Sequence, residues 1–254
     1  MKILTIHTSY NELPLLQYKY EHCRQNGIDL YVIDNMSNDG TEEFLNEKNI
    51  PRSFVDTNNA FDLRPLLYAM DRKIHELKPD WFIYSGVDMF PEAPEGIRNM
   101  IEAADRQGFT QIQMKQYIFR YTGEHKPGNP FANYFYYNHA PEMSLITKYD
   151  RSVVISPDRV TRENIVLKRD AGIFFEMHAS KLPEERMETL RRREAAWKNG
   201  MNRGWGHHYP AEAKINFTYR STQCLDIRRT QDFFMYSRLQ KIKTNELQLS
   251  GARS

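Results

Sequence analysis

Residues 32–41 decide the fold, and they read Val32-Ile33-Asp34-Asn35-Met36-Ser37-Asn38-Asp39-Gly40-Thr41. An apolar run that ends in a carboxylate and continues into small polar residues is typical of a strand followed by a tight turn, in which Gly40 can take a positive φ. Thr41-Glu42-Glu43 then opens a helix, because acidic side chains are favourable near the positive end of the helix dipole. Ligands of α/β folds bind at such strand ends. The stretch therefore predicts an α/β fold with a ligand at a strand end.

The start of the chain supplies a matching unit. Residues 2–8 read as a buried strand, Ser9-Tyr10-Asn11-Glu12 form the loop that leaves it, and Pro14 opens a helix that ends near Gly27. The alternation continues along the chain. We expect helices near residues 14–26, 41–47, 63–77, 94–107 and 183–199, and strands near residues 2–7, 28–34, 53–56, 81–85 and 110–118. These spacings predict a mostly parallel sheet with helices on both faces.

The Tyr-Asn-Glu loop, the Asp-Asn-x-Ser-Asn-Asp-Gly-Thr turn and segments 61–67 and 78–84 together resemble the opening of family 2 glycosyltransferases, which have the Rossmann-like GT-A fold. The resemblance implies an inverting glycosyltransferase that moves a sugar from a nucleotide-diphosphate donor to an acceptor hydroxyl. It divides the chain into a nucleotide-sugar-binding core at 1–118, an acceptor part of the same domain at 119–243 and a tail at 244–254. The acceptor part is expected to combine an irregular, aromatic-rich segment with C-terminal helices.

The resemblance also implies where the donor binds. The expected donor contacts are Thr8, Tyr10, Asn11, Asp34, Asn35, Arg64 and Asp88. A carboxylate accepts well from a uracil N3–H or a ribose hydroxyl, and an amide both donates and accepts. UDP is therefore the favoured donor nucleotide. Arg64 has an alternative interpretation as a surface residue at a helix start. Ser37 and Asp39 are interpreted as turn-forming residues, with Asp39 capping the helix that follows.

The expected metal site departs from the family pattern. Nucleotide-sugar transfer usually needs a divalent cation, Mn²⁺ or Mg²⁺, held by carboxylate oxygens near the diphosphate. The family motif is Asp-x-Asp, often followed by Glu, whereas this chain has Gly86-Val87-Asp88-Met89. Asp88 alone is retained, and its alternative role is to cap a turn. His178, at the end of the apolar run 173–177, is the expected second ligand of the metal or the diphosphate.

Inverting transfer needs a carboxylate base beyond Asp88 in the chain. The candidates are Glu142, Asp150, Asp158 and Asp170, and Asp170 and Asp150 are placed first. Sugars stack on aromatic rings, so Tyr136 and Tyr137 are candidates for acceptor contact, although aromatic residues of this segment equally suit a core. His207 and His208 are further candidates for acceptor or phosphate contact; at most one of them could face a single ion from a regular strand.

Composition fits one α/β domain of a soluble protein. Of 254 residues, 40% are hydrophobic and 27% charged, and no apolar run or basic leader predicts a membrane span or a signal peptide. Two cysteines, Cys23 and Cys224, make no disulfide framework, which favours a cytoplasmic protein. Residues 1–158 hold 16 Lys and Arg against 22 Asp and Glu, whereas residues 159–254 hold 19 against 11. The basic part is expected to face an anionic partner or to be a solvated surface.

Three other functions remain open. The first is a nucleotide-sugar-binding or carbohydrate-binding protein that has lost catalysis, which Gly86 and Met89 favour. The second is a nucleotidyltransferase; it should show a Gly-rich basic loop after the first strand, where this chain has Ser-Tyr-Asn-Glu. The third is a glycosyltransferase that acts on nucleic acid. The basic part, with Trp197 and Trp205, could bind a strand and stack its bases, although no recognition motif is present. Glycans, lipids and proteins are the other acceptor classes.

Overall fold

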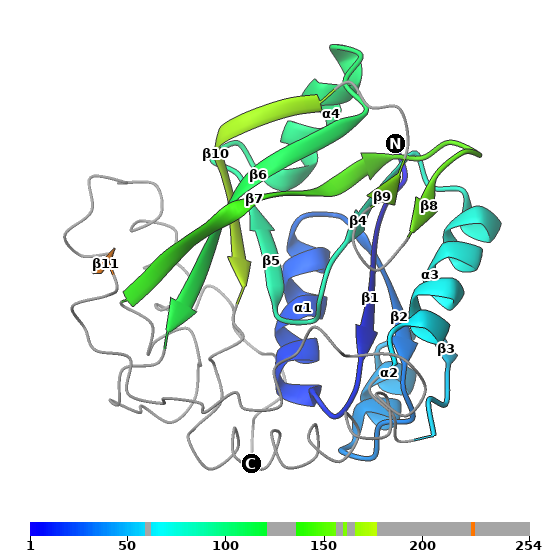
Figure 1. Ribbon diagram of the computed structural model, residues 1–254. Coiled ribbons are helices and arrows are strands. Elements are labelled where there is room, and N and C mark those ends of the chain that lie inside the picture. The colour runs from blue at the N-terminus through cyan, green and yellow to red at the C-terminus, as the bar shows by residue number, and fades with distance from the viewer. Residues whose placement is uncertain (59–61, 121–135, 156–159, 162–165, 177–224, 227–254) are drawn as a thin grey trace.

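A computed structural model describes residues 1–58, 62–120, 136–155, 160–161, 166–176 and 225–226. The helices are α1 (Leu13–Gln25), α2 (Thr41–Glu47), α3 (Arg64–Leu77) and α4 (Ile97–Arg106). The strands are β1 (Ile3–Ser9), β2 (Asp29–Asp34), β3 (Arg52–Phe54), β4 (Trp81–Tyr84), β5 (Met89–Glu92), β6 (Gln111–Arg120), β7 (Tyr136–Lys148), β8 (Val154–Ile155), β9 (Val160–Thr161), β10 (Val166–Glu176) and β11 (Leu225–Asp226). Figure 1 shows their arrangement.

The main sheet has the strand order β3-β2-β1-β4-β7-β6-β10-β5, and β11 pairs with β7. The β3–β2, β2–β1, β1–β4 and β6–β10 pairs are parallel, whereas β7 runs antiparallel to both β4 and β6, and β5 antiparallel to β10. The expectation of a mostly parallel sheet is therefore wrong, and the sheet is mixed. The sheet is mixed chiefly because β7 runs antiparallel to its neighbours. The Gly-, Pro- and Asn-rich composition of residues 119–178 did not indicate a strand there.

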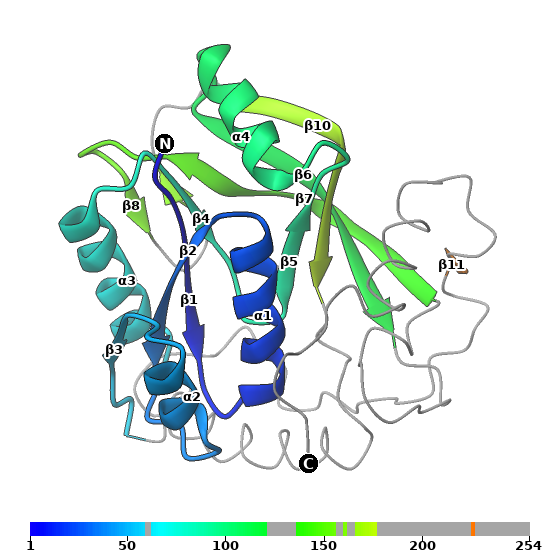
Figure 2. The ribbon, with the colours of Figure 1, turned by 180° about the vertical axis from the view of Figure 1, so that it is seen from behind.

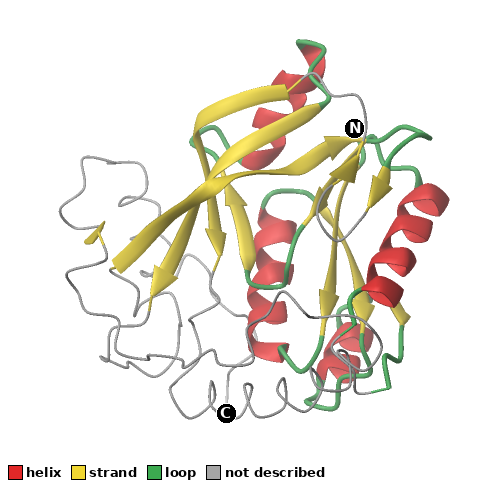
Figure 3. Cartoon of the chain, viewed as in Figure 1, coloured by secondary structure: helices red, strands yellow, loops and turns green. Residues whose placement is uncertain are grey.

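Helices cover both faces of the parallel strands, as predicted. On one face, α1, α2 and α4 pack on side chains such as Ile3, Val32 and Ile83. On the other face, α3 and β8 pack on Leu4, Ile33 and their neighbours. β1 is buried along nearly its whole length, as a strand covered on both faces should be. Figure 3 shows α1 and α3 on either side of β1, and Figure 2 shows the α1 face from behind.

The predicted helices in the first 110 residues are confirmed to within three residues at each end, and Pro14 and Gly27 mark the start and end of α1 as predicted. Pro14 lies in the first turn of α1 and Pro65 in the first turn of α3. Gly27 follows α1 with φ +62°, and Lys78 is the C-cap of α3, directly before Pro79. The helix expected at 183–199 lies outside the described residues, and so does the tail at 244–254.

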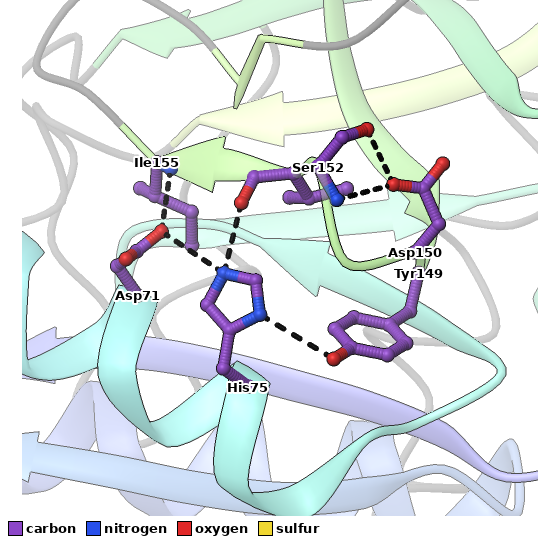
Figure 4. A network of polar contacts seen from close by, with 7 residues as sticks. Asp71, His75, Tyr149, Asp150, Ser152 and Ile155 are labelled. Carbon is purple, nitrogen blue, oxygen red and sulfur yellow. Dashed lines mark hydrogen bonds and ion pairs between the residues drawn. The ribbon is translucent and has the colours of Figure 1, made fainter.

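Polar contacts attach the segment after β7 to α3 (Figure 4). Nε2 of His75 lies 2.9 Å from the carbonyl oxygen of Val153, and Nδ1 lies 3.3 Å from the hydroxyl of Tyr149. One turn earlier, the Asp71 carboxylate accepts a hydrogen bond of 2.9 Å from the Ile155 amide. These three contacts, which we call the α3 clasp, hold β8 over the α3 face. No helix in the described part of the chain is long and apolar enough to cross a membrane.

Candidate functional site

Hydrogen bonds join the loop after β1 to the loop after β2. The Asn11 amide donates to Oγ of Ser37 at 2.9 Å, and the Asn38 amide donates to Oδ1 of Asn11 at 2.8 Å. The amide of Leu13, the first residue of α1, donates to the Asp39 carboxylate at 2.9 Å. Each loop therefore satisfies polar groups of the other. We call residues 9–12 and 34–40 the paired loops; they lie at the carboxyl ends of two adjacent parallel strands.

The backbone of the paired loops is unusual at two residues. Asn11 and Met36 take the left-handed conformation with φ of +53° and +56°, which is uncommon for a residue other than glycine. Asn tolerates this region, whereas a long side chain such as that of Met36 seldom occupies it. Tyr10 and Met36 are both exposed, at 39% and 55%. Local strain of this kind clusters at ligand-binding sites, which agrees with the predicted ligand at this edge.

The predicted donor residues of β2 have structural partners. Asp34 is fully buried and accepts hydrogen bonds from the hydroxyl of Ser37 at 2.6 Å and from its amide at 3.0 Å. Burial raises the pKa of Asp34, and the two bonds from Ser37 act against that rise. Asn35 donates its amide to the Ser9 carbonyl and accepts from the Thr57 amide at 3.2 Å. Asp34 and Asn35 therefore shape the paired loops, and their contact with a donor stays a prediction.

The turn-forming role predicted for Ser37 and Asp39 is confirmed, with one difference. Asp39 accepts from the hydroxyl of Thr41 at 2.6 Å and also binds the first amide of α1. The N-cap of α2 itself is Gly40, with φ +90°. Asp39 thus serves two helices, because the paired loops bring the start of α1 beside it. Thr8, the last predicted donor residue of β1, is half-buried.

Arg64 is held by a neighbour at the start of α3. Its guanidinium donates to both carboxylate oxygens of Asp62, at 2.8 Å and 2.7 Å, and hydrogen bonding to Asp62 raises the pKa of Arg64. Asp62 is buried, whereas the Arg64 side chain is half-exposed. A two-point pair of this kind fixes the plane of the guanidinium. Arg64 is therefore oriented by Asp62, and contact with a base or phosphate stays a prediction.

Asp88 lies on the turn between β4 and β5, which we call the Asp88 loop (residues 85–89). The Met89 amide donates to the Gly86 carbonyl at 3.3 Å and closes the turn. A Cβ atom built on Gly86 would lie only 2.5 Å from Oδ1 of Asp88. The Asp88 carboxylate therefore fills the space that a side chain at position 86 would need. A side chain at position 86 would therefore require the Asp88 carboxylate to move from its present place.

Sequence reasoning missed two buried basic residues near this loop. Lys19, on α1, is completely buried and donates to Oγ of Ser85 at 2.9 Å and to the Gly86 carbonyl at 3.2 Å. Burial lowers the pKa of Lys19 to about 8, while the charges of Cys23 and Asp88 raise it. The signal was present in the sequence, because Lys19 stands at helical spacing from Leu15, Leu16 and Cys23, where an apolar residue belongs.

His7 is the second of these residues. It is fully buried on β1, and Nδ1 lies 3.0 Å from the Thr8 carbonyl, so Nδ1 carries the proton. Nε2 has no hydrogen-bond partner within the described residues. Burial, followed by the charge of Lys19, lowers the pKa of His7 to about 3, so the ring is neutral at physiological pH. Side chains alternate between the two faces of a strand, so Ile3, Thr5 and His7 share one face of β1. A histidine on this buried face is the signal that the sequence offered.

A charged pair lies further along α1. Nε2 of His22 is 3.2 Å from the Glu92 carboxylate, and both side chains are buried. Burial alone lowers the pKa of His22, but the hydrogen bonds and charges of Cys23 and Glu92 outweigh it and raise the pKa to about 9. His22 is therefore charged at neutral pH. Together with Lys19, it places two buried cationic groups on the face of α1 that meets β4 and β5.

Asp88 is the predicted metal ligand that lies within the described residues. Asp88 provides a hard carboxylate oxygen of the kind that Mg²⁺ and Mn²⁺ prefer. Within the described ranges, however, no three His, Cys, Asp or Glu side chains are grouped to hold an ion. The positive charge of Lys19 also acts on Asp88. Asp88 thus fits a single anchor of an ion, and His178, the second predicted ligand, lies outside the described residues.

Strand register relates β10, which precedes His178, to the Asp88 loop. Glu176, the last residue of β10, pairs with Met89, the residue after Asp88. Asp170 lies in a break of the β10–β6 register, since Arg169 pairs with Met114 and Ile173 with Lys115. Such bulges are frequent next to active sites. By register, Glu176 lies closer to Asp88 than Asp170 does, which sequence reasoning did not predict.

The other predicted residues are less closely placed. Asp150 accepts from the amide and hydroxyl of Ser152, and Tyr149 donates its amide to Asp80, directly before β4. Asp150 therefore lies near the amino end of β4, whereas Asp88 follows its carboxyl end, and the role of Asp150 as the base stays a prediction. Tyr136 and Tyr137 begin β7 and pair with β6 and β11. His207 and His208, like candidate Asp158, lie outside the described residues.

Comparisons with known proteins give distant structural matches alone. No protein-family model and no curated protein matches the sequence. Among solved structures, TarS from S. aureus matches with a TM-score of 0.45 and 14% identity, over 76% of this chain and 39% of that one. TarS 1–349 in complex with UDP matches at 0.42 and 13%, over 77% and 65%. A putative glucose-1-phosphate thymidylyltransferase from Bacillus anthracis, in complex with a sucrose, matches at 0.40 and 13%, over 77% and 95%.

This chain thus spans less than half the length of the first TarS chain. All of these TM-scores lie below 0.5, so the function proposed next rests on the residues of this chain.

Proposed function

We propose that this chain is an inverting glycosyltransferase that takes its sugar from a nucleotide-diphosphate donor. One observation carries the proposal. The loops that hold the Tyr-Asn-Glu, Asp-Asn-x-Ser-Asn-Asp-Gly-Thr and Asp88 motifs follow β1, β2 and β4, which are adjacent parallel strands in the order β2-β1-β4. Their carboxyl ends meet at one edge of the sheet, where α/β folds bind nucleotides. Motifs that are far apart in the sequence are thereby gathered at one site.

The paired loops are the proposed donor site. Exposed Tyr10 offers an aromatic surface to a base, and half-buried Thr8 and Asn35 line the ends of their strands. Asn11 and Asp34 hold the loops in place through Ser37. A UDP-sugar is the donor that the residue types favour, because carboxylate and amide groups match the uracil N3–H and the ribose hydroxyls. Arg64, oriented by Asp62, is the candidate for the phosphates.

Asp88 is the proposed anchor for a divalent cation, with His178 as its second ligand. When bound, such a cation neutralises the charge that develops on the departing diphosphate. In the transfer step, the acceptor oxygen bonds to the anomeric carbon while the bond from that carbon to the diphosphate oxygen breaks. The acceptor hydroxyl gives its proton to a carboxylate base. We assign that base to β10, where Asp170 was predicted and Glu176 lies beside the Asp88 loop by register.

The acceptor side is proposed for the start of β7. Figure 1 shows the course of β7. β7 is antiparallel to β4 and pairs with it through residues 146–148, so the start of β7, which holds Tyr136 and Tyr137, extends beyond the carboxyl end of β4. This is the edge at which the Asp88 loop lies. A sugar acceptor that stacks on aromatic rings suits this position. His207 and His208 remain candidates for acceptor or phosphate contact, and the acceptor is a glycan or another hydroxyl compound.

A second candidate function is a nucleotide-sugar-binding protein without transferase activity. The observation in its favour is the Asp88 loop, in which Asp88 fills the space at Gly86 and lies near the buried charge of Lys19. A site with one carboxylate beside a cation holds a metal ion weakly. The paired loops would still bind a nucleotide. The two functions therefore differ in their metal dependence and turnover.

Calorimetric titration of UDP, GDP, CDP and TDP, each with and without Mn²⁺, tests the proposal. Tight binding of one nucleotide that depends on the metal, and that Asp88→Ala abolishes without change in the unfolding temperature, supports the transferase. Binding that is indifferent to Mn²⁺ and to Asp88→Ala supports the binding protein. Donor hydrolysis in the presence of Mn²⁺ then separates the two by turnover. Binding of no nucleotide at all rejects both.

A further inference from the structure

Lys19 is an anomaly in the core of the protein. Lysine is almost never fully buried unless its charge is paired, because removing an ammonium group from water costs several kcal/mol. Lys19 has no exposed surface, and it stands within the buried face of α1. An apolar residue at this position would complete that face without the cost. Packing alone therefore does not explain why a charged residue occupies this position.

All three donors of the ammonium group go to the Asp88 loop. They reach Oγ of Ser85 at 2.9 Å, the carbonyl of Gly86 at 3.2 Å and the carbonyl of Met89. An ammonium group has three N–H bonds, so none is left for a ligand. The two carbonyls come from the first and last residues of the turn that Gly86 and Met89 close. Lys19 thus acts on a ligand only through the loop.

The surroundings of Lys19 fix its position further. Nζ lies 5.1 Å from the centre of the Phe90 ring, a cation–π distance. The charged and titratable groups that act on it are Cys23 on α1, His7 on β1 and Asp88 on the loop. The last of these is the carboxylate that the loop presents. A helix from one side of the sheet is therefore bonded to both ends of the turn that carries Asp88.

We infer that Lys19 is a positioning residue: its three hydrogen bonds fix the conformation of residues 85–89 and thereby the place where Asp88 meets a ligand. This inference deepens the proposed function and rests on it for the identity of the ligand. The effect of Lys19 on the conformation of the loop does not depend on the proposed function. Without Lys19, Ser85 and the two carbonyls lose the ammonium donor that joins both ends of the turn to α1.

The test compares Lys19→Met with Lys73→Met. Lys73, on α3, is a matched control: it also bonds a partner, Glu76, and lies 5.4 Å from an aromatic ring, that of Tyr31, but on the opposite face. Titration of UDP with Mn²⁺ is done below the unfolding temperature of each variant. We expect Lys19→Met to weaken binding at least tenfold, with Lys73→Met within twofold of wild type. Unchanged affinity in folded Lys19→Met overturns the inference.

A milder pair of variants applies if Lys19→Met does not fold. Ser85→Ala removes one of the three acceptors and leaves the lysine in place; Ser53→Ala, which removes a hydrogen bond of 2.7 Å to Tyr31, is its control. We expect Ser85→Ala to weaken UDP–Mn²⁺ binding about threefold and Ser53→Ala to leave it unchanged. Equal affinities in the two variants overturn the inference.

A spectroscopic measurement separates this inference from the proposed function. The methyl resonance of Met89, in protein labelled at methionine methyl groups and assigned with Met89→Leu, reports the loop without any nucleotide. We expect it to shift in Lys19→Met or Ser85→Ala and to stay in place in Lys73→Met and Ser53→Ala. If wild type binds no nucleotide but this pattern holds, the proposed function fails and the positioning role stands. A Met89 resonance unchanged in Lys19→Met or Ser85→Ala overturns the positioning role.

Discussion

The helices α1 and α3 cover opposite faces of β1, and they bury different kinds of residue. α3 buries Leu66, Leu67, Met70 and Ile74, and its polar contacts lie at the margin, in the α3 clasp. α1 buries Lys19 and His22 among its apolar side chains. The α3 face therefore stabilises the fold, whereas the α1 face accepts the cost of buried charge directly beneath the Asp88 loop. Of these two helices, α1 alone buries ionisable side chains, which indicates that packing is not its sole role.

The α3 face should carry the largest effect on stability. Phe82 is fully buried against α3, and Phe82→Ala should lower the free energy of unfolding by about 3–5 kcal/mol, because it leaves a cavity. Urea unfolding measures this loss. Tyr68→Ala, which removes a 69% exposed ring from the same face, is the control and should stay within about 0.5 kcal/mol. A loss below 1 kcal/mol in Phe82→Ala, or a comparable loss in Tyr68→Ala, would break the comparison.

The α1 face should make stability depend on pH. Because the pKa of His22 rises from 6.5 to about 9 on folding, the folded state holds an extra proton between these values. Its stabilisation is complete below pH 6.5 and falls as pH rises, by about 1.5 kcal/mol between pH 6.5 and 8. Lys19, whose pKa falls to about 8, acts in the opposite direction above pH 8, since the unfolded state then binds more protons.

His22→Gln isolates this term. The variant keeps a donor for Glu92 but cannot titrate, so its free energy of unfolding should lose the decline between pH 6.5 and 8. Urea unfolding at three pH values in this window measures the slope. A decline of the same size in wild type and His22→Gln would show that His22 is not its source.

The α3 clasp should contribute a smaller, local term. His75→Leu keeps the volume of the ring in part and removes the contacts to Val153 and Tyr149. We expect a loss of about 1 kcal/mol in urea unfolding, the usual value of a partly buried hydrogen bond, with nucleotide affinity unchanged. A change in nucleotide affinity would show that the two faces are coupled, contrary to the comparison.

Gly86→Ala should have the smallest effect on stability and a clear effect on binding. The backbone at Gly86 is not left-handed, so alanine brings no backbone strain there; its Cβ instead displaces the mobile end of Asp88. We expect a change in unfolding free energy within about 0.5 kcal/mol and a several-fold loss of metal-dependent UDP affinity by calorimetry. Unchanged affinity would mean that the present position of Asp88 does not matter for the ligand.

The sequence predicted the local parts of this fold and missed the distant ones. Pro14, Gly27, Pro65 and the turn at Gly40 mark element ends through backbone chemistry that acts within a few residues. β7 pairs with β4 across more than 60 residues, and nothing local fixes its direction. The position of Asp150 was hidden for the same reason: it depends on which end of β4 the antiparallel β7 leads to.

The candidate site divides in the same way. The paired loops were predicted because their motifs are contiguous in the sequence. Lys19 and His7 were missed, although each breaks an apolar pattern of helix or strand, because such a break does not say what the side chain meets. Ser85, which accepts from Lys19, lies on the loop after β4, 66 residues further along the chain. Asp88, whose charge acts on both Lys19 and His7, lies on the same loop.

The paired loops also limit how this protein can be altered. The Asn11 amide donates to Ser37, and the Leu13 amide donates to Asp39, each across 26 residues of sequence. A loop transplanted alone from another protein would leave its partner loop with unmatched amides. Loop grafting therefore requires residues 9–13 and 34–40 to move together, so that each amide keeps its acceptor.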